Sequence, residues 1–597
     1  MKKNTNGSVK SAIKTEWDLS VFYKNEKDPK IEKEIKAVEK ATLAFEKKYK
    51  NKDYISSSKK LLRAMQDYEE LSKISGNVKG PLYFYFRKDL NSNDNIAQAA
   101  GTKLSNRLTI SSNKIAFFTI NISKIPTTRQ KTYLNDKNLA SYAYFLKLIF
   151  DNAKYILSEK EEQVIDLLSQ TSYSMWIDGQ DKLLSSQSID WKGEKMPLAK
   201  ALSILSDLPK KESDEMSSKI NSILKSVSSF AEAEINAVYN FKKVLDERRG
   251  YQNPYSSTIL GYQNTEKSIM LLIDLITKNF KISQRFYKVH AKLLKMKKLS
   301  VSDRGVKIGE IKKKFDFQTS VSIVGDIFSK IGQKYSDIFY RLLNSGQVDV
   351  FPKVGKTGGA YCAHDYNAPT FILLNHTDDL RSLETLAHEM GHAIHSELSK
   401  KQSIFYQHYT MSSAEVASTF FEQVSLNEIE SQLSEKEKMI SLHGRLQGDI
   451  STIFRQIACF NFELELHQRI RSEGQLSKEE IAKLLRKHLE SYMGDAFNVT
   501  DDDGYFFVNW SHIRRFFYVY SYAYGQLISR AFFENWKKDN KYIEKIDQFL
   551  SAGGSMSPEE VFKKAGIDIL DPKFFLSGLK SIEKDIERLE KFADKDI

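Results

Sequence analysis

The stretch "TLAHEMGHAIHSELS", Thr385 to Ser399, holds two histidines four residues apart with a glutamate directly after the first. The text from Asp378 to Ser399 predicts a helix, because an Asp or Thr is available as its N-cap and its apolar residues recur every three to four positions. These apolar residues are Leu383, Leu386, Met390 and Ile394. The histidines lie about 160° around the helix from Met390. They therefore face away from the apolar stripe.

Residues four apart on a helix lie one turn above the other, so His388 and His392 can direct their imidazoles at one tetrahedral metal ion. Glu389 is displaced by about 100° and can reach a water bound to that metal, which is the position of a general base. The alternative is an exposed histidine pair on a surface helix. The motif alone leaves that alternative open.

A catalytic zinc needs a third protein ligand and keeps its fourth position for water. The segment Met411–Glu430 predicts another helix, with Ser412 or Ser413 as its cap and Glu415 in its first turn. Glu415 and Glu422 are seven residues apart and share one face. Two glutamates on one face are more often solvated, but a pair of neutral histidines favours a carboxylate ligand. Glu422 is then available to orient a histidine from outside the ligand set.

Composition limits the class of protein. The 597 residues, with 41% hydrophobic and 28% charged residues, are typical of a globular protein. The net charge of +13 comes from lysines dispersed among glutamates, so short runs such as Lys292–Ser300 favour a solvated helical face over a nucleic-acid surface. Only two cysteines occur, which offers no disulfide framework and no thiolate metal cluster.

The ends and the apolar runs bear on the compartment. The charged N-terminus is not followed by an apolar core of roughly 7–15 residues, so it does not resemble a secretory signal. The longest nearly apolar run, Ile269–Ile276, is too short to span a bilayer. We expect a cytoplasmic protein with no nucleic-acid and no membrane partner.

Helix-like spacing dominates the chain. Clear examples are Lys33–Tyr49, Ser57–Ser75, Glu161–Trp176 and Glu234–Gly250. Strand-like text is concentrated in Gly346–Pro352 and Thr370–Asn375, which flank the glycine-containing Gly355–Ala363. The sequence therefore predicts a mainly α protein with a small β-sheet directly upstream of the histidine helix. A boundary near residue 200 would separate an N-terminal helical domain, 1–200, from a catalytic domain, 201–597.

Three separated blocks, in order, resemble the zinc oligopeptidases that include the oligoendopeptidase F and thimet oligopeptidase types. The blocks are Gly358–Ser399, Ala414–Glu422 and His512–Gln526. The likeness is closest to oligoendopeptidase F, runs from about Leu205 to about Leu579, and extends more weakly through the N-terminal helices.

The resemblance implies that His388, His392 and Glu415 bind one zinc ion and that Glu389 is the catalytic glutamate. It also implies a zincin-like fold: an elongated, two-lobed helical body with the metal deep in a channel. Such a channel admits short, unstructured peptides as substrates and excludes folded proteins.

The third block lies in a very aromatic stretch, Tyr505–Gly525, which by composition alone favours a packed core helix. The resemblance implies instead that His512 and nearby tyrosines bind substrate and stabilise the transition state. Tyr518 and Tyr522, four apart, are similar to the family's tyrosine pair, and Tyr520 with Tyr524 is a rival pair on another face.

The resemblance also places Gly358 and Gly359 in a mobile loop beside the substrate strand, which fits the unusual backbone angles that glycine tolerates.

The sequence thus predicts a zinc-dependent metalloendopeptidase that hydrolyses internal bonds of short oligopeptides. One alternative is a zinc exopeptidase of the same superfamily, similar to a dipeptidyl carboxypeptidase. Another is a non-catalytic peptide-binding protein on this scaffold, against which the intact set His388, Glu389, His392 and Glu415 argues. The oligomeric state stays open.

Overall fold

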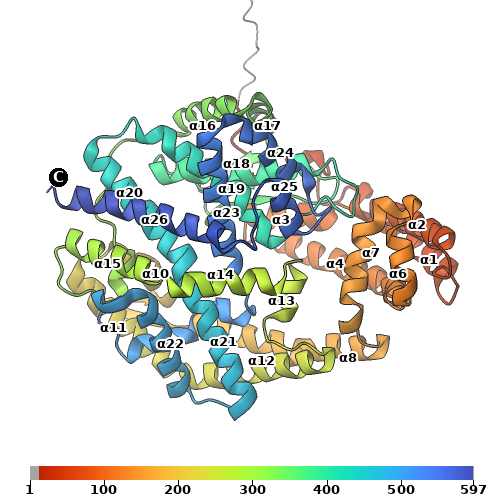
Figure 1. The fold of residues 1–597 in the computed structure, drawn as a ribbon, viewed down its shortest axis with the longest axis horizontal. Helices are drawn as coiled ribbons and strands as arrows, with labels where there is room; N and C mark the ends of the chain where they lie inside the picture. The colour runs from red at the N-terminus through yellow and green to blue at the C-terminus, as the bar shows by residue number, and fades with distance from the viewer. Residues whose placement is uncertain (1–12, 596–597) are drawn as a thin grey trace, which may run out of the picture.

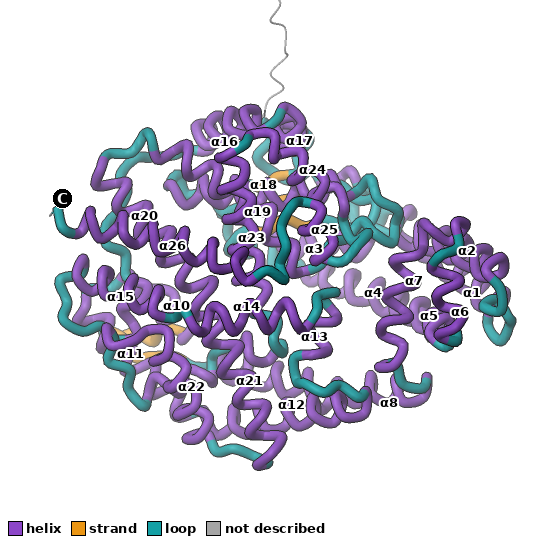
Figure 2. The backbone as a smooth tube through the Cα atoms, in the orientation of Figure 1, coloured by secondary structure: helices purple, strands orange, loops and turns teal. Residues whose placement is uncertain are grey.

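The computed structural model describes residues 13–595, and its architecture is mainly α, as the sequence predicts (Figure 2). The first helices are α1 (Pro29–Tyr49), α2 (Ser58–Gly76), α3 (Gly80–Leu90), α4 (Asn95–Ile115), α5 (Phe117–Ser123), α6 (Thr127–Leu134), α7 (Ala143–Asn152), α8 (Glu159–Ser169), α9 (Met175–Ser185) and α10 (Leu198–Ile204). The middle helices are α11 (Lys210–Ser226), α12 (Ser228–Arg249), α13 (Ser256–Gly261), α14 (Glu266–Lys278), α15 (Lys281–Leu293), α16 (Phe317–Ile331), α17 (Gln333–Asn344), α18 (Leu380–Ser399) and α19 (Met411–Glu430). The last are α20 (Glu435–Asp449), α21 (Arg455–Glu473), α22 (Lys478–Met493), α23 (Tyr520–Lys538), α24 (Ile543–Ala552), α25 (Pro558–Lys564) and α26 (Pro572–Ala593).

The helices form groups (Figure 1). Helices α1, α2, α6 and α7 lie together at the right end of the view, and the larger body has an upper group that includes α16–α19 and α24 and a lower group that includes α11, α12, α21 and α22. This arrangement agrees with the expected elongated, two-lobed helical body. No helix within residues 13–595 combines the length and the apolar character needed to cross a membrane.

Local sequence explains most helix ends. Asp28 caps α1 by accepting a hydrogen bond from the backbone N–H of Lys30, with Pro29 in the first turn. Helix α12 ends at Gly250, as predicted, and this glycine has a φ of 79°. The predicted helix over Glu161–Trp176 is only partly correct, because a π-helical turn at Gln170–Ser174 separates α8 from α9.

The predicted small sheet forms where expected. Its strands are β3 (Val348–Asp349), β4 (Tyr361–Ala363) and β5 (Phe371–Leu373), in the order β3–β5–β4. Strand β3 runs parallel to β5, and β4 runs antiparallel to it with Cys362 opposite Ile372. The β5 side chains are buried, whereas β4 lies at the edge of the sheet and is partly exposed. The edge of β4 therefore leaves backbone groups available for another strand.

A second sheet was not predicted. Strands β1 (Ser188–Trp191) and β2 (Glu194–Pro197) form an antiparallel hairpin across Lys192 and Gly193, both with positive φ. Ile189 and Trp191 are buried in the hydrophobic core that extends along the chain as far as Leu589. The stretch that suggested a boundary near residue 200 thus packs with the chain that follows it. The division into 1–200 and 201–597 stays a prediction.

The N-terminal part holds the three-stranded sheet in place. Trp17 Nε1 donates to the carbonyl of Ile372 at 2.8 Å. From α3, Asp89 accepts from the hydroxyl of Tyr361 at 2.5 Å, and its carbonyl accepts from the backbone N–H of Thr357 at 2.8 Å. These contacts fix β4 and the loop before it relative to the helix that follows.

Candidate active site

Helix α18 is built as the sequence predicts. Asp379 caps it by accepting from the backbone N–H of Ser382 at 2.7 Å. The predicted apolar stripe is entirely buried: Leu383, Leu386, Met390 and Ile394. His388 and His392 lie on the opposite side, with side chains 25% and 16% exposed. The apolar stripe thus anchors the helix, and the imidazoles face the interior space beside it.

Two glycines bring three helices together at the histidines. A Cβ on Gly391 of α18 would lie 2.7 Å from the Cα of Ser418 in α19. A Cβ on Gly525 of α23 would lie 3.0 Å from the Cβ of Glu415. Because only glycine permits such close approach, α19 lies near enough to α18 for Glu415 to reach both histidines. Helix α19 begins at Met411 with Thr410 as its N-cap residue, although the Thr410 side chain makes no capping hydrogen bond. The predictions of Ser412 or Ser413 as the cap and of Glu415 in the first turn were therefore wrong, because Glu415 lies just past that turn.

The ligand atoms of His388, His392 and Glu415 converge. Oε2 of Glu415 lies 3.4 Å from Nε2 of His388 and 3.5 Å from Nε2 of His392. The three ligand atoms all lie within 4.8 Å of one another. A tetrahedral zinc ion about 2.0–2.1 Å from each ligand requires ligand atoms about 3.3–3.4 Å apart. The donor set and its spacing therefore fit a single metal ion.

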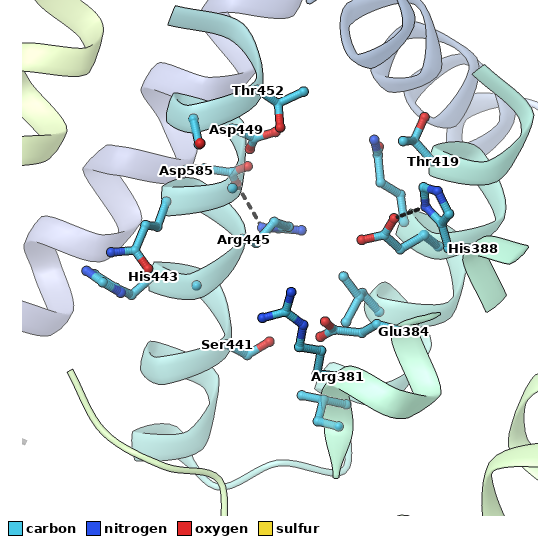
Figure 3. Close-up of a pocket in the computed structure, with 18 of the residues that line it drawn as sticks. Arg381, Glu384, His388, Thr419, Ser441, His443, Arg445, Asp449, Thr452 and Asp585 are labelled. Carbon is cyan, nitrogen blue, oxygen red and sulfur yellow. Dashed lines mark hydrogen bonds and ion pairs between the residues drawn. The ribbon is translucent and has the colours of Figure 1, made fainter. Parts of the chain in front are cut away.

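Glu422 lies behind this group. Its Oε2 is 2.7 Å from Nδ1 of His388, a contact drawn as a dashed line in Figure 3. A hydrogen bond from Nδ1–H to a carboxylate leaves Nε2 with its lone pair for a metal. Burial opposes protonation of His388, but Glu415 and Glu422 outweigh it and raise its pKa well above the usual range. A metal at this group must therefore compete with a proton.

Glu389 sits in the wall of the same space. It is 7% exposed, and burial raises the pKa of its carboxyl against the opposing charges of His388 and His392. A carboxyl with a raised pKa, next to a metal-binding group, is suited to accept and release protons nearer to neutral pH.

The aromatic segment from Asp502 to Gly525, in which the third block lies, is not one helix. It contains 3-10 turns at Asp502–Val508 and Ser511–Arg514, and α23 begins only at Tyr520. Phe516 and Phe517 have φ values of 45° and 63°, which are rare for such side chains. The backbone N–H of Phe517 donates to both carboxylate oxygens of the buried Glu463, at 2.9 and 3.0 Å. Glu463 thus holds the turn that presents Tyr518.

Tyr518 connects His512 with Tyr522. Its hydroxyl lies 2.6 Å from Nδ1 of His512 and 3.3 Å from the hydroxyl of Tyr522. Burial, with the charges of Arg455 and Arg515, lowers the pKa of His512 to about 4, so its imidazole is neutral at pH 7.

The rival tyrosine pair points elsewhere. Tyr520 and Tyr524 are fully buried in the core, and Tyr520 accepts a hydrogen bond from Asn264. Of the four tyrosines, Tyr522 lines the cavity beside the metal-binding group.

That cavity has a volume of about 1120 Å³. Figure 3 shows one wall carrying His388 and Thr419 and the facing wall carrying Asp449 and Thr452. Glu389, Glu415 and Tyr522 also line it. The space can hold an extended peptide segment next to the candidate metal ligands.

The glycines near β4 lie beside this cavity. Gly358 and Gly359 are exposed, and a Cβ on either would meet no atom within 4 Å. Gly359 has a φ of 77°, and its carbonyl accepts from Asn375 Nδ2 at 2.7 Å. The neighbouring Ala360 lines the cavity, whereas the two glycines are absent from its wall.

Comparison with known proteins adds the family. The sequence model described as peptidase family M3 matches residues 227–581, more than half of the chain. The chain belongs to peptidase family M3. It is therefore a metallopeptidase. A second family model, described as oligopeptidase F, matches residues 121–186 of this M3 peptidase.

Individual relatives agree with this assignment. The M3 peptidase is 24% identical to oligopeptidase PepF of Bacillus subtilis over 98% of this chain and 88% of the relative. It is 27% identical to an oligoendopeptidase F homologue of Borreliella burgdorferi, over 93% and 94%. The crystal structure of oligoendopeptidase-F from Enterococcus faecium has the same fold, with a TM-score of 0.70 at 18% identity over 95% and 98%. The resemblance to oligoendopeptidase F found in the sequence is confirmed.

Several cavity residues of the M3 peptidase were missed in the sequence. Glu384 lies one turn before His388, and that spacing of four could have indicated a shared face. Burial and the nearby charge of Glu422 raise the pKa of Glu384 to about 8. Arg455 stands alone in the apolar run "ISTIFRQIACF", where an arginine needs a reason. Arg304 carries no local signal, because only the fold brings it to the cavity.

Proposed function

We propose that this M3 peptidase is a zinc-dependent endopeptidase that hydrolyses internal bonds of short oligopeptides. The observation that carries the proposal is the tetrahedral spacing of Nε2 of His388, Nε2 of His392 and Oε2 of Glu415 beside a cavity of about 1120 Å³. A cavity of this size takes a peptide segment but no folded protein. The cytoplasmic location expected from the sequence stays a prediction.

His388, His392 and Glu415 would hold the zinc ion, and Glu422 would keep His388 in the required tautomer and orientation. When bound, zinc supplies a Lewis acid that lowers the pKa of a water and polarises the peptide carbonyl. Two neutral imidazoles and one carboxylate are a common ligand set for catalytic zinc.

Glu389 acts as general base and then as general acid. Its carboxylate accepts a proton from the attacking water and later gives that proton to the leaving amine. Its burial supports this role, because burial raises the pKa of the carboxyl toward neutral pH. A carboxyl with such a pKa can both accept a proton and release it.

His512, Tyr518 and Tyr522 stabilise the negative charge that develops on the carbonyl oxygen. Neutral His512 donates from Nδ1 to Tyr518, and the bond between the hydroxyls of Tyr518 and Tyr522 uses one of their two hydrogens, so the other hydrogen stays free to donate to the oxyanion. Gly358 and Gly359 bind substrate through their backbone, next to the free edge of β4, to which an extended peptide adds as a strand.

A peptide library tests this function. Metal-loaded wild type, Glu389→Gln and the control Glu39→Gln, whose glutamate pairs with Arg107 far from the site, are each incubated with mixed peptides, and the products are read by mass spectrometry. We expect internal cleavage by wild type and the control, and a loss of roughly 10²–10⁴-fold in Glu389→Gln.

Other outcomes would support the alternatives. Equal product yields from wild type and Glu389→Gln would remove Glu389 from the mechanism. Products shorter by only one or two residues at one end would indicate the exopeptidase, and peptide binding without products would indicate the non-catalytic protein.

A further inference from the structure

Two arginines that are not among the candidate metal ligands line the cavity. Arg304 lies in the 3-10 turn Val301–Gly305, and Arg455 is the first residue of α21. Both guanidinium groups lie against the ring of Phe506, 5.8 and 5.9 Å from its centroid, and that of Arg455 also lies 4.9 Å from the centroid of Trp510. Aromatic faces hold these side chains in fixed positions without neutralising their charge.

Arg304 and Arg455 have no acidic partner among the described residues, a lack that they share with Arg381 but not with the other three arginines that line the cavity. Arg445 pairs with Asp585, Arg530 with Asp449 and Asp585, and Arg588 with Glu430. Among the ion pairs of residues 13–595, none involves Arg304 or Arg455. Within this same part of the chain, the buried Nε of Arg455 has no hydrogen-bond partner.

The two cations contact the same ring, that of Phe506, and are therefore near each other. Burial and the charge of Arg304 lower the pKa of Arg455 to about 10, which still leaves Arg455 charged at pH 7. Two neighbouring, partly buried cations without an anion are unfavourable, and an anion placed between them would remove the repulsion. Buried, unpaired polar groups of this kind need an explanation, and a ligand is one.

Further donors without partners surround the pair. Trp510 Nε1 and the hydroxyl of Tyr492 are both buried and have no hydrogen-bond partner among the described residues. Burial raises the pKa of Tyr492, and the charges of Arg304 and Arg455 oppose that shift, so the hydroxyl lies within their field. The local chemistry consists of donors and positive charge, which suits an anion and not a cation.

Both arginines lie in regular secondary structure, Arg304 in a 3-10 turn and Arg455 at the start of α21. A π-helical turn at Ile450–Phe454 joins α20 to α21 directly before Arg455, and such turns occur frequently at functional sites. From α20, Gln447 Nε2 donates to the carbonyl of Arg304 at 2.9 Å and to that of Val306 at 3.3 Å. The same continuous helix therefore positions both guanidinium groups.

We propose that Arg304 and Arg455 form a carboxylate-binding subsite that recognises the peptide substrate by its C-terminal carboxylate or by an aspartate or glutamate side chain. The inference rests on the proposed function, because it takes a peptide in the cavity as the ligand. Guanidinium groups bind carboxylates through paired hydrogen bonds. The ring of Trp510, which contacts the Arg455 guanidinium, lies 6.5 Å from the ring of His512, so the subsite lies near the proposed catalytic histidine.

Matched peptides distinguish the two sources of the carboxylate. The holoenzyme is assayed with one neutral sequence in three forms: a free C-terminus, an amidated C-terminus, and an amidated form with one internal Gln replaced by Glu. The form preferred by wild type identifies the source. Arg304→Gln and Arg455→Gln should lower kcat/KM for the preferred form roughly 10- to 100-fold, mainly through KM, and leave the neutral amidated form little changed.

Controls separate recognition from folding and from general charge. Arg381→Gln removes another cation that lines the same cavity, whereas the cations stacked on Phe506 and Trp510 are Arg304 and Arg455. Equal loss in Arg381→Gln would mean general electrostatic attraction and overturn the subsite. Arg455→Lys keeps the charge and loses the planar pairing, so it should retain the melting temperature of wild type and still lose discrimination.

Binding without turnover tests the subsite independently of cleavage. In zinc-loaded Glu389→Gln, calorimetry should show tighter binding of the preferred carboxylate form than of the neutral amide, and adding Arg304→Gln should abolish the difference. This binding experiment is informative even if wild type cleaves no peptide. Absence of cleavage would refute the proposed function but not the carboxylate-binding subsite. The titrations are repeated with added chloride. If all peptides bind with equal affinity, and chloride changes each affinity by the same factor, an inorganic anion occupies the arginines and the proposal is overturned.

Discussion

The N-terminal helices and the region around the candidate active site have interiors of different kinds. Among α1–α7, the core is aromatic and aliphatic, and charges such as Arg107 with Glu32 and Glu39 pair near the surface. All eleven histidines of the chain lie between His290 and His512, most of them buried or partly buried. The same region buries Glu463 and joins Arg514 to the fully buried Glu234.

The difference indicates where this molecule accepts a cost in stability. Buried charged and polar groups are expensive unless they are paired, and an apolar core of the same volume would be at least as stable. Such a cost is commonly retained where a site must hold groups in fixed positions. The N-terminal part buries fewer such groups, among them Lys79 and Asp89, and it holds the sheet through Asp89 of α3 and through Trp17, which precedes α1.

The largest expected difference between the two regions is in their response to acid. Burial is the main cause that lowers the pKa of His364 and His512 from 6.5 to about 4 and that of His443 from 6.5 to about 3. Because the unfolded chain binds more protons than the folded one between these values and 6.5, the folded state loses stability as the pH falls from 6.5 toward 4. The summed loss is on the order of several kcal/mol.

Hydrogen exchange resolved by peptide, corrected for the intrinsic rates, checks this at pH 7 and pH 5. Protection should fall for peptides within residues 290–512 and persist for peptides within 29–150, where no histidine occurs. An equal fall in both regions would contradict the assignment of acid sensitivity to the buried histidines.

The next largest difference concerns the same substitution in the two interiors. Arg514→Gln leaves Glu234 buried without the guanidinium that donates to it at 2.9 and 2.8 Å, and should cost about 3–5 kcal/mol of stability. Arg107→Gln removes exposed pairs and should cost about 0–1 kcal/mol. Denaturant unfolding measures both changes. Similar costs for the two variants would mean that the buried pair is not strongly coupled to the fold.

A third comparison uses one change at two tyrosines. Tyr518→Phe removes a hydroxyl that contacts His512 and Tyr522, and should lower kcat roughly 10²–10³-fold with little change in KM. Tyr524→Phe removes a buried hydroxyl that has no hydrogen-bond partner among the described residues, so it should keep activity and lose no stability. Steady-state kinetics gives kcat and KM for both variants, and melting curves give their stability. A comparable fall in kcat for Tyr524→Phe would contradict the choice of pair.

Features that depend on local spacing were predictable. The apolar stripe of α18, its cap at Asp379, the Gly250 stop and the site of the small sheet all follow from residues within a few positions of one another. His388 and His392 were predictable as neighbours because they share one helix face, and Glu415 lies beside them in the fold, whereas the role of the three as metal ligands stays a prediction.

Features that depend on distant partners were not predictable. The break before α23 follows from Phe516 and Phe517, whose unusual φ angles are held by Glu463, 54 residues earlier than Phe517. The hairpin at β1 and β2 has only four-residue strands and gave no clear alternation. Arg304 and Arg455 meet on the ring of Phe506, and these three residues come from separate segments of the chain. No local sequence pattern encodes such a contact.

The smallest effect is expected one step outside the ligand set. Glu422→Gln keeps an acceptor for Nδ1–H of His388 but removes the negative charge, and should weaken zinc affinity roughly 10- to 100-fold. Glu430→Gln is the matched control, because Glu430 lies on the same helix and lines the same cavity but pairs with Arg588. Competition with a chelator gives both affinities. The Glu422 carboxylate acts on the metal only through the His388 imidazole. Unchanged zinc affinity in Glu422→Gln, or equal weakening in Glu430→Gln, would therefore show that packing on α18 orients His388 and that its hydrogen bond does not.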